Sequence, residues 1–275
     1  MPELPEVETI RNVLRKGQHD SPSLLGKTII TVQLFWERTL ADPSPDAFRE
    51  RIVGQVIEEI DRRGKYLLFR LSDDTLVIHL RMSGDLVVEN SADPIATHHR
   101  MVLDLDGGVR LAFNDARKFG RVWLLKDPNN MLSSLGPEPL SAKFSARELF
   151  QQLNSRRRQL KPLLMDQNFI AGLGNIYTDE ALHRAGLHPK VISNNLTFKQ
   201  VKRLYGSIRE VLNEGIRRNG ASIDWVYRGG DFQNHFRVYQ QTGEQCPRCG
   251  TPIERITVGQ RGTHFCPQCQ PPPKE

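Results

Sequence analysis

The sequence lacks long hydrophobic runs, internal repeats and extended low-complexity tracts. A membrane-spanning helix needs about 18 consecutive apolar residues, and no run approaches this length. Glutamates stand near the first residue, where a secretory signal has a basic region followed by an apolar one, so we expect no signal peptide. The 275 residues therefore predict a cytoplasmic globular protein of one large or two ordinary domains, in which disulfides are not expected.

Acidic residues are less frequent in the second half of the chain than in the first. Residues 135–275 carry a net charge of +8, whereas residues 1–134 carry −2. An excess of basic residues in one half favours a polyanionic partner. Nucleic acid is the first candidate, and an anionic membrane surface is the second.

The spacing of hydrophobic residues predicts a helix at 3–16, followed by a β-rich region. In the helix, Pro5 suits the first turn, and Val7, Ile10 and Leu14 fall on one face. Beyond it, short apolar runs alternate with turn signals, which indicates an antiparallel β-sandwich or barrel. The expected strands are 28–36, 55–60, 65–71, 75–82, 100–105, 109–115 and 120–126.

The stretch 127–145 is rich in Pro, Gly, Asn and Ser, and we interpret it as a linker between domains. Helical patterns follow the linker. Ser145 and Glu148 form a capping box at the first of them, and Thr197 suits the cap of the last. The expected helical segments are 145–153, parts of 159–185, and 197–219.

The chain has only four cysteines, and they form two CxxC pairs separated by sixteen residues. This spacing predicts four thiolates around a tetrahedral Zn²⁺, with the intervening residues forming a hairpin. Four protein ligands leave no position for water, so the zinc is expected to be structural. The alternative is two disulfides or unligated core thiols, which a cytosolic setting disfavours. The expected ligands are Cys246, Cys249, Cys266 and Cys269.

Two features of the second half are suited to binding phosphate. Arg261 lies in GQRGT at the expected hairpin tip, where it can reach a phosphate or a groove; the alternative is a solvated turn arginine. Gly172 and Gly174 precede a helix that starts near Asn175, and such a turn binds phosphate through backbone N–H groups; the alternative is a tight turn between helices. A basic cluster precedes this turn: Arg156, Arg157, Arg158 and Lys161.

Seven segments, in order along nearly the whole chain, resemble the bacterial formamidopyrimidine-DNA glycosylase family. They are PELPEVET, RRGKYLLF, HLRMSGDL, DARKFG, LGPEPL, KPLLMDQNFIAGLGNIY and the cysteine hairpin with GQRGT. The PELPEVE start is similar to the oxidised-purine branch of the family more than to the endonuclease-VIII-like pyrimidine branch.

The resemblance implies an α+β multidomain fold. Its parts are an N-terminal helix on an antiparallel β-sandwich (1–134), a helical domain with a helix–two-turn–helix (135–240) and a zinc-finger hairpin (241–275). It implies a monomeric, cytoplasmic and nucleoid-associated bacterial enzyme of base excision repair that holds one structural Zn²⁺. The implied partner is double-stranded DNA with oxidised bases or abasic sites. The implied reaction is excision of oxidised purines, 8-oxoguanine and formamidopyrimidines, followed by β,δ-elimination.

The resemblance also implies roles for individual residues. Pro2, exposed when Met1 is removed, is implied as the nucleophile, with Glu3 and Glu6 as its acid–base partners. Lys65 corresponds to a β-strand lysine that contacts the phosphate of the lesion and assists elimination. The residues implied to fill the gap left by the flipped base are Met82, Arg117 and Phe119. The DNA-contacting positions, to which the basic cluster adds Lys161, are His98, Arg157, Asn175 and Arg261. The resemblance also implies a catalytic role for Arg261 in the last elimination step.

The N-terminal residues fit this chemistry without the family. A free α-amine has a pKa of about 8, so a useful fraction of a terminal proline is unprotonated at neutral pH. Its attack on the anomeric carbon of the sugar gives an iminium ion that cannot lose its charge at nitrogen, which favours elimination. Glu3 and Glu6 lie on one helix face beside this amine. The alternative, that first-turn carboxylates only complement the helix dipole, is the interpretation we adopt for Glu8.

Two places depart from the family pattern. The segment THHRM (97–101) has Arg100 where a second spaced histidine is common, and residues 220–240 do not match the base-capping loop closely. The lesion preference is therefore open. Two other hypotheses are a glycosylase that prefers oxidised pyrimidines, and a DNA-binding protein without catalysis that uses only the zinc hairpin and the basic helices.

Overall fold

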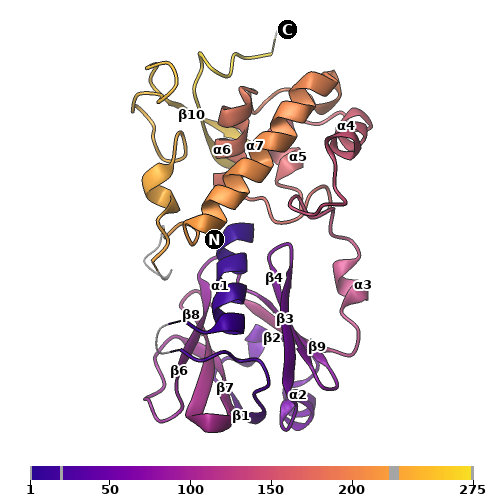
Figure 1. Cartoon of the computed structure of the whole chain (residues 1–275), viewed down its shortest axis with the longest axis vertical. Helices are drawn as coiled ribbons and strands as arrows, with labels where there is room; N and C mark the ends of the chain where they lie inside the picture. The colour runs from indigo at the N-terminus through magenta and orange to yellow at the C-terminus, as the bar shows by residue number, and fades with distance from the viewer. Residues whose placement is uncertain (1, 19–20, 223–228, 274–275) are drawn as a thin grey trace. The chain divides into compact units, whose positions relative to one another are not determined.

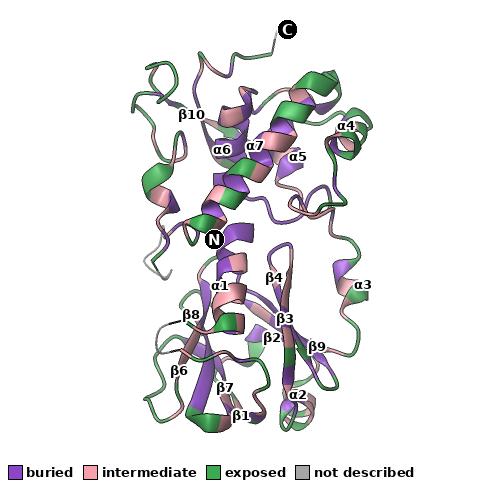
Figure 2. Cartoon of the chain, in the orientation of Figure 1, coloured by how far each residue is buried: buried purple, intermediate pink, exposed green. Residues whose placement is uncertain are grey.

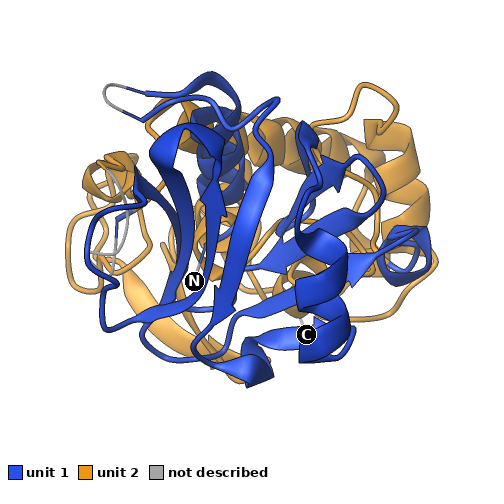
Figure 3. Ribbon diagram, turned by 90° about the horizontal axis from the view of Figure 1, so that it is seen from below, with its two compact units in different colours: residues 1–134, 222–228 blue, residues 135–221, 229–275 orange. Residues whose placement is uncertain are grey.

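A computed structural model describes residues 2–18, 21–222 and 229–273. Contacts between elements divide the chain into two compact units, which Figure 3 shows in blue and orange. Unit 1 consists mainly of residues 1–134, and unit 2 of residues 135–221 and 229–275. Figure 1 labels most of the helices and strands. None of the helices in the described ranges is long and apolar enough to cross a membrane.

Unit 1 contains two β-sheets that share one hydrophobic core, so the predicted sandwich is confirmed. Phe113 of the first sheet and Phe69 of the second are both fully buried in this core. The strands pair antiparallel except for β2 and β9, which are parallel. The first sheet has the order β1 (Ile29–Leu34), β7 (His99–Leu105), β8 (Val109–Asp115), β6 (Gly84–Asn90). The second has the order β2 (Leu40–Asp42), β9 (Arg121–Leu125), β5 (Thr75–His79), β4 (Tyr66–Leu71), β3 (Ile57–Arg63).

Helix α1 (Leu4–Lys16) packs against β3 and β4 of the second sheet. Val7, Ile10 and Leu14, the apolar stripe read from the sequence, are its buried face. The helix therefore begins and ends close to the predicted positions, because its periodicity and its environment agree.

Three elements of unit 1 are not predicted by the sequence pattern: β2, α2 (Pro45–Ile52) and β6. Helix α2 is short and buries only Phe48 and Ile52, so its apolar stripe is too brief to recognise. It begins at the Ser44 cap, whose hydroxyl accepts a hydrogen bond from Ala47 N–H at 3.4 Å. Strand β6 begins at Gly84, inside the sequence SGD (83–85), whose residue types are typical of a turn. Two 3₁₀ turns complete the unit: η1 (Glu37–Thr39) and η2 (Asp106–Gly108).

Most of the predicted linker 127–145 is irregular, with one short helix, α3 (Asn129–Leu132). The main segment of the first unit ends at Ser134, within this stretch. The Ser145 capping box is present: its hydroxyl accepts from Glu148 N–H at 3.2 Å, and the Glu148 carboxylate accepts from Ser145 N–H at 2.7 Å.

Unit 2 is built around two helices, α6 (Asn175–Ala185) and α7 (Phe198–Arg217), which pack against each other. They approach closely at Gly215, where an added Cβ would lie 2.5 Å from Cε1 of Tyr177. Buried and exposed residues alternate along α7, as Figure 2 shows, which is the pattern of an amphipathic helix. The remaining helical elements are α4 (Ala146–Asn154), α5 (Leu160–Leu164), η3 (Ser193–Asn195) and η4 (Phe232–His235).

The cysteine-rich segment contains the predicted hairpin, formed by β10 (Glu254–Val258) and β11 (Arg261–Phe265). Gly259 and Gln260 form its two-residue turn, with φ angles of 55° and 61°. Such left-handed turns match the twist of the strands they join. Arg261 is therefore the first residue of β11 and pairs with Val258, next to the tip and not at it.

Candidate active site and metal centre

The first turn of α1 places two carboxylates beside Pro2. Glu3 is the N-cap of the helix, and Oε2 of Glu6 accepts a hydrogen bond from Glu3 N–H at 2.7 Å. Glu3 and Glu6 are buried, with 2% and 3% of their surfaces exposed. Glu6 therefore caps the helix and fixes the backbone next to Pro2, which a purely catalytic interpretation does not anticipate. Met1, whose removal the sequence interpretation requires, lies outside the described residues.

Glu8 connects α1 to the turn that carries Lys65. Its carboxylate pairs with Arg11 at 2.6 Å and with Arg62 of β3 at 2.9 Å. Burial raises the pKa of Glu8, but the hydrogen bonds and charges of the two arginines outweigh it and leave that pKa below its usual value. Nη1 of Arg62 also donates to the Gly64 carbonyl at 2.9 Å. Lys65 follows in the tight turn between β3 and β4, not within a strand, and only 6% of it is exposed.

His79, which the sequence analysis did not single out, supports the segment before Met82. Its Nδ1 accepts a hydrogen bond from Arg81 N–H at 3.0 Å. Arg81 has a φ angle of 56°, so this contact stabilises a left-handed backbone conformation. Burial, followed by the charges of Arg81 and Lys65, lowers the pKa of His79 to about 3. The ring is therefore neutral at physiological pH, as its acceptor role requires.

Asp115 joins the two loops that carry the residues expected to fill the gap in the DNA. One carboxylate oxygen accepts from the Ser83 hydroxyl and from Arg117 N–H, the latter at 3.2 Å. The other accepts from Gly120 N–H at 2.7 Å. Asp115 is only 1% exposed. Asp115 is the first residue of the DARKFG motif, but the sequence does not predict its hydrogen bond with Ser83.

The three side chains of these loops lie at the surface. Met82 is 39% exposed and Phe119 is 48% exposed, both unusual for large apolar residues. The guanidinium carbon of Arg117 lies 5.2 Å from the centre of the Phe119 ring. Met82 and Phe119 therefore lie outside the hydrophobic core of the sandwich, and both are available to a ligand.

Arg100 supports the loop that carries His98. Its buried guanidinium donates to the Asp115 carbonyl at 2.7 Å and to the Thr97 carbonyl at 3.3 Å. A third nitrogen lies 3.4 Å from Nδ1 of His98, which is exposed. Arg100, which departs from the family pattern, therefore has a structural role next to His98, a predicted DNA-contacting residue. The second departure, 220–240, lies partly outside the described residues.

In unit 2, a side chain of the DQNF segment organises the turn that leads into α6. The Gln167 amide donates to the Leu173 carbonyl at 2.7 Å and accepts from Gly172 N–H at 2.9 Å. Asn175 is the first residue of α6, as predicted, and its amide donates to the Gly262 carbonyl at 3.2 Å. Arg157 is exposed between α4 and α5.

Lys161 does not lie with the surface arginines, and the structure corrects that expectation. It is fully buried, and its Nζ pairs with Oδ1 of Asp179 at 2.7 Å and donates to the Gly262 carbonyl at 3.0 Å. The other oxygen of Asp179 accepts from His264 N–H at 2.9 Å. This network connects β11 to α5 and α6 and fixes Gly262, which follows Arg261. The side chain of Arg261 itself is exposed.

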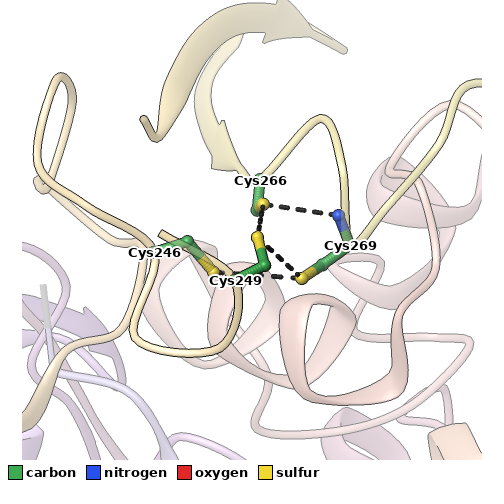
Figure 4. A group of neighbouring side chains, drawn as sticks. All are labelled: Cys246, Cys249, Cys266 and Cys269. Atoms are coloured by element: carbon green, nitrogen blue, oxygen red, sulfur yellow. Dashed lines mark hydrogen bonds between the residues drawn. The ribbon is translucent and has the colours of Figure 1, made fainter. Parts of the chain in front are cut away.

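The four cysteines meet in one cluster, and their sulfur atoms all lie within 4.8 Å of one another (Figure 4). Contacting pairs are 3.4, 3.5 and 3.9 Å apart. A tetrahedral site with Zn–S bonds of about 2.3 Å has sulfur–sulfur edges of about 3.8 Å. The spacing therefore fits one structural zinc, and it excludes the disulfide alternative, which needs about 2.05 Å.

Side chains around the cluster influence the thiols. The hydroxyl and then the backbone N–H of Thr251 lower the pKa of Cys249 to about 6. Burial raises the pKa of Cys269. Nε2 of His183, on α6, lies 3.3 Å from Sγ of Cys246.

Comparisons with known proteins address the same three regions. Family models match residues 1–122 (formamidopyrimidine-DNA glycosylase N-terminal domain), 135–226 (formamidopyrimidine-DNA glycosylase H2TH domain) and 243–272 (zinc finger found in FPG and IleRS). The formamidopyrimidine-DNA glycosylase of Chloroflexus aurantiacus is 48% identical over 280 residues, covering 98% of each chain. That of Protochlamydia amoebophila is 44% identical over 280 residues, covering 98% of this chain and 99% of its own.

The chain therefore belongs to the formamidopyrimidine-DNA glycosylase family. It is accordingly a DNA glycosylase of base excision repair with a zinc finger. Among solved structures, MutM in complex with DNA containing carbocyclic 8-oxo-G aligns with a TM-score of 0.91 at 36% identity, covering 98% of this chain and 100% of that one. The Lactococcus lactis Fpg in complex with abasic-site DNA aligns with a TM-score of 0.90 at the same identity and coverage. The family relationship and the α+β fold inferred from the sequence motifs are confirmed.

Proposed function

We propose that this glycosylase is bifunctional, removing oxidised purines from double-stranded DNA and then cleaving the strand, with Pro2 as its nucleophile. The observation that carries the proposal is the first turn of α1, where Glu3 and Glu6 are buried beside Pro2. The family assignment and the neighbour that binds DNA containing carbocyclic 8-oxo-G support the substrate class.

The chemistry follows from the secondary amine of a terminal proline. The nitrogen attacks the anomeric carbon, the bond to the damaged base breaks, and the amine loses its proton. The bond from the anomeric carbon to the ring oxygen then breaks, the oxygen takes a proton, and the product is an open-chain iminium ion. Because this nitrogen carries no proton to lose, the positive charge stays and withdraws electrons from the sugar. Loss of the neighbouring protons then expels the 3′ phosphate and afterwards the 5′ phosphate, which is β- and δ-elimination.

Two carboxylates and a lysine move the protons in this scheme. Glu3 protonates the opening sugar or the leaving base, and Glu6, while it holds the Glu3 backbone, assists proton transfer from the amine. Lys65 binds the phosphate of the lesion and assists elimination. Arg261 contacts the DNA backbone from the start of β11 and assists the last elimination step.

Binding of the lesion requires the damaged nucleotide to leave the stack, at a cost of a few kcal/mol. Met82, Arg117 and Phe119 offset this cost by occupying the gap. Backbone contacts come from His98 in unit 1 and, in unit 2, from Arg157 and from Asn175 at the start of α6. The enzyme acts as a monomer on nucleoid DNA, and its structural zinc, held by the four cysteines, shapes the segment that carries Arg261.

The test is reduction by borohydride during reaction with a duplex that contains 8-oxoguanine. Borohydride converts the iminium ion to a stable amine, so the wild type should form a covalent protein–DNA adduct. Peptide mapping of this adduct should find the DNA attached to the N-terminal peptide. Lys65→Met is the matched control, because it removes an amine near the site without removing the nucleophile. Absence of an adduct, equal trapping by Pro2→Ser, or mapping to a lysine would refute the mechanism.

Oxidised pyrimidines are the second candidate substrate class. One structural neighbour, the Lactococcus lactis Fpg, was solved with DNA containing an oxidised pyrimidine. Excision from 8-oxoguanine and thymine-glycol duplexes under matched conditions separates the two classes. Faster excision of thymine glycol would reverse the preference, and a protein without catalysis would leave both duplexes intact.

A further inference from the structure

Three polar side chains, spaced four residues apart along α6, contact the cysteine-rich segment. They are Asn175, Asp179 and His183. Residues at this spacing lie on one face of a helix. Asn175 and Asp179 hold the backbone of β11, as described above. His183 is the third member of the row, and it is the one that reaches a metal ligand.

The contact of His183 is a hydrogen bond from its ring to sulfur. Nε2 lies 3.3 Å from Sγ of Cys246, and the two residues are 1% and 2% exposed. Within the part of the chain that the structure describes, Nδ1 of the same ring has no hydrogen-bond partner. A neutral imidazole has one N–H donor and one acceptor nitrogen. Placing the hydrogen on Nε2 satisfies the contact with sulfur and leaves only an acceptor without a partner.

We propose that His183 is a positioning residue of the zinc centre, which donates its Nε2–H to the Cys246 thiolate. Four thiolates around one Zn²⁺ give the site a net charge of −2. A donor aimed at one sulfur withdraws part of that charge and fixes the direction of its lone pairs, as partners of metal ligands generally do. His183 does not itself bind zinc, because the four sulfur atoms already complete a tetrahedron.

The arrangement also fixes where the zinc finger lies on α6. Asn175 and Asp179 hold the strand that begins with Arg261, and His183 holds Cys246 at the other end of the same segment. Loss of the His183 donor should therefore loosen the first CxxC pair while leaving the contacts of β11 intact. The proposal concerns metal retention and does not depend on which lesion the enzyme removes.

The first experiment measures how fast excess chromogenic chelator takes zinc from the full-length protein. His183→Leu removes the donor, and release should become faster by on the order of 10- to 100-fold. His183→Gln keeps an N–H donor, and its release rate should stay close to that of the wild type. His188→Leu is the matched control, because His188 is a buried histidine that packs on Phe265 of the hairpin without contacting sulfur.

Release from His183→Leu at the wild-type rate would overturn the proposal. Release from His183→Gln or His188→Leu as fast as from His183→Leu would also overturn it, because ring packing would then explain the effect. A second measurement needs no variant: nitrogen-15 NMR of the zinc-loaded wild type should find the His183 hydrogen on Nε2. A ring with its hydrogen on Nδ1 only would refute the donor role even if His183→Leu does not fold.

Discussion

His79 gives unit 1 a specific sensitivity to acid. Burial and the charges of Arg81 and Lys65 lower the pKa of His79 to about 3 in the folded protein. In an unfolded chain the pKa of histidine is about 6.5. The unfolded state therefore binds the proton more tightly, and the free energy of unfolding must fall as the pH falls through the unfolded value.

The size of this effect follows from the two pKa values. At pH 5 an unfolded histidine lies about 1.5 pH units below its pKa and is charged, while folded His79 remains neutral. Each unit corresponds to about 1.4 kcal/mol, so His79 alone should lower the free energy of unfolding by about 2 kcal/mol between about pH 8 and pH 5. The loss should continue with falling pH and level off near pH 3, where the folded ring is protonated as well.

The variant His79→Asn tests this prediction. Its amide cannot titrate in this range, and its oxygen can replace Nδ1 as the acceptor for Arg81 N–H. Urea unfolding is followed through the fluorescence of Trp123, whose ring lies 6.1 Å from that of Tyr66 in unit 1. Between about pH 8 and pH 5 the wild type should lose about 2 kcal/mol more than the variant. Equal losses would refute the reasoning, and His98→Asn controls for removal of an exposed histidine.

Three further predictions concern buried polar groups and the zinc. Asp115→Ala should lower the free energy of unfolding, measured by thermal unfolding, by about 2–4 kcal/mol, because two loops lose a charged acceptor. In single-turnover assays it should slow excision more than it weakens binding to undamaged DNA. An excision rate equal to that of the wild type would contradict this prediction. Lys161→Met should cost about 3–5 kcal/mol, because it leaves Asp179 buried without its counter-charge. The double variant Lys161→Met/Asp179→Leu should recover most of that loss, and strict additivity in urea unfolding would disprove the coupling. Cys249→Ser should weaken DNA binding by disordering the hairpin with Arg261, so an unchanged affinity in a gel-shift titration would count against it.

Regular elements and the metal ligands were predictable from sequence because local pattern and final environment agree there. The apolar stripe of α1 and the caps of α4 and α7 specify helices before any tertiary contact forms. The two CxxC pairs likewise have few arrangements other than a four-thiolate site. The exposure of Met82 and Phe119, in contrast, followed only from the family resemblance.

The errors arose where a side chain is controlled by a partner distant in sequence. Lys161 follows three arginines, and the sequence suggests that it belongs to a surface cluster. In the structure it is buried in an ion pair with Asp179. Asp115 carries no local signal, because its partner Ser83 is 32 residues away in the sequence. The partner of His79 is only two residues away, but the left-handed backbone at Arg81 that brings its N–H to the ring is not marked in the sequence. A single sequence does not contain these pairings.

Asp115 fixes the backbone of the two loops independently of the side chains that the loops carry. It accepts two backbone N–H groups and one hydroxyl, and it makes no hydrogen bond to the side chains of Met82, Arg117 or Phe119. The tips of the loops can therefore be exchanged while the backbone keeps its course. On the role proposed for these three side chains, variation at their positions is a route to altered lesion or opposite-base preference, because new side chains would be presented on an unchanged backbone.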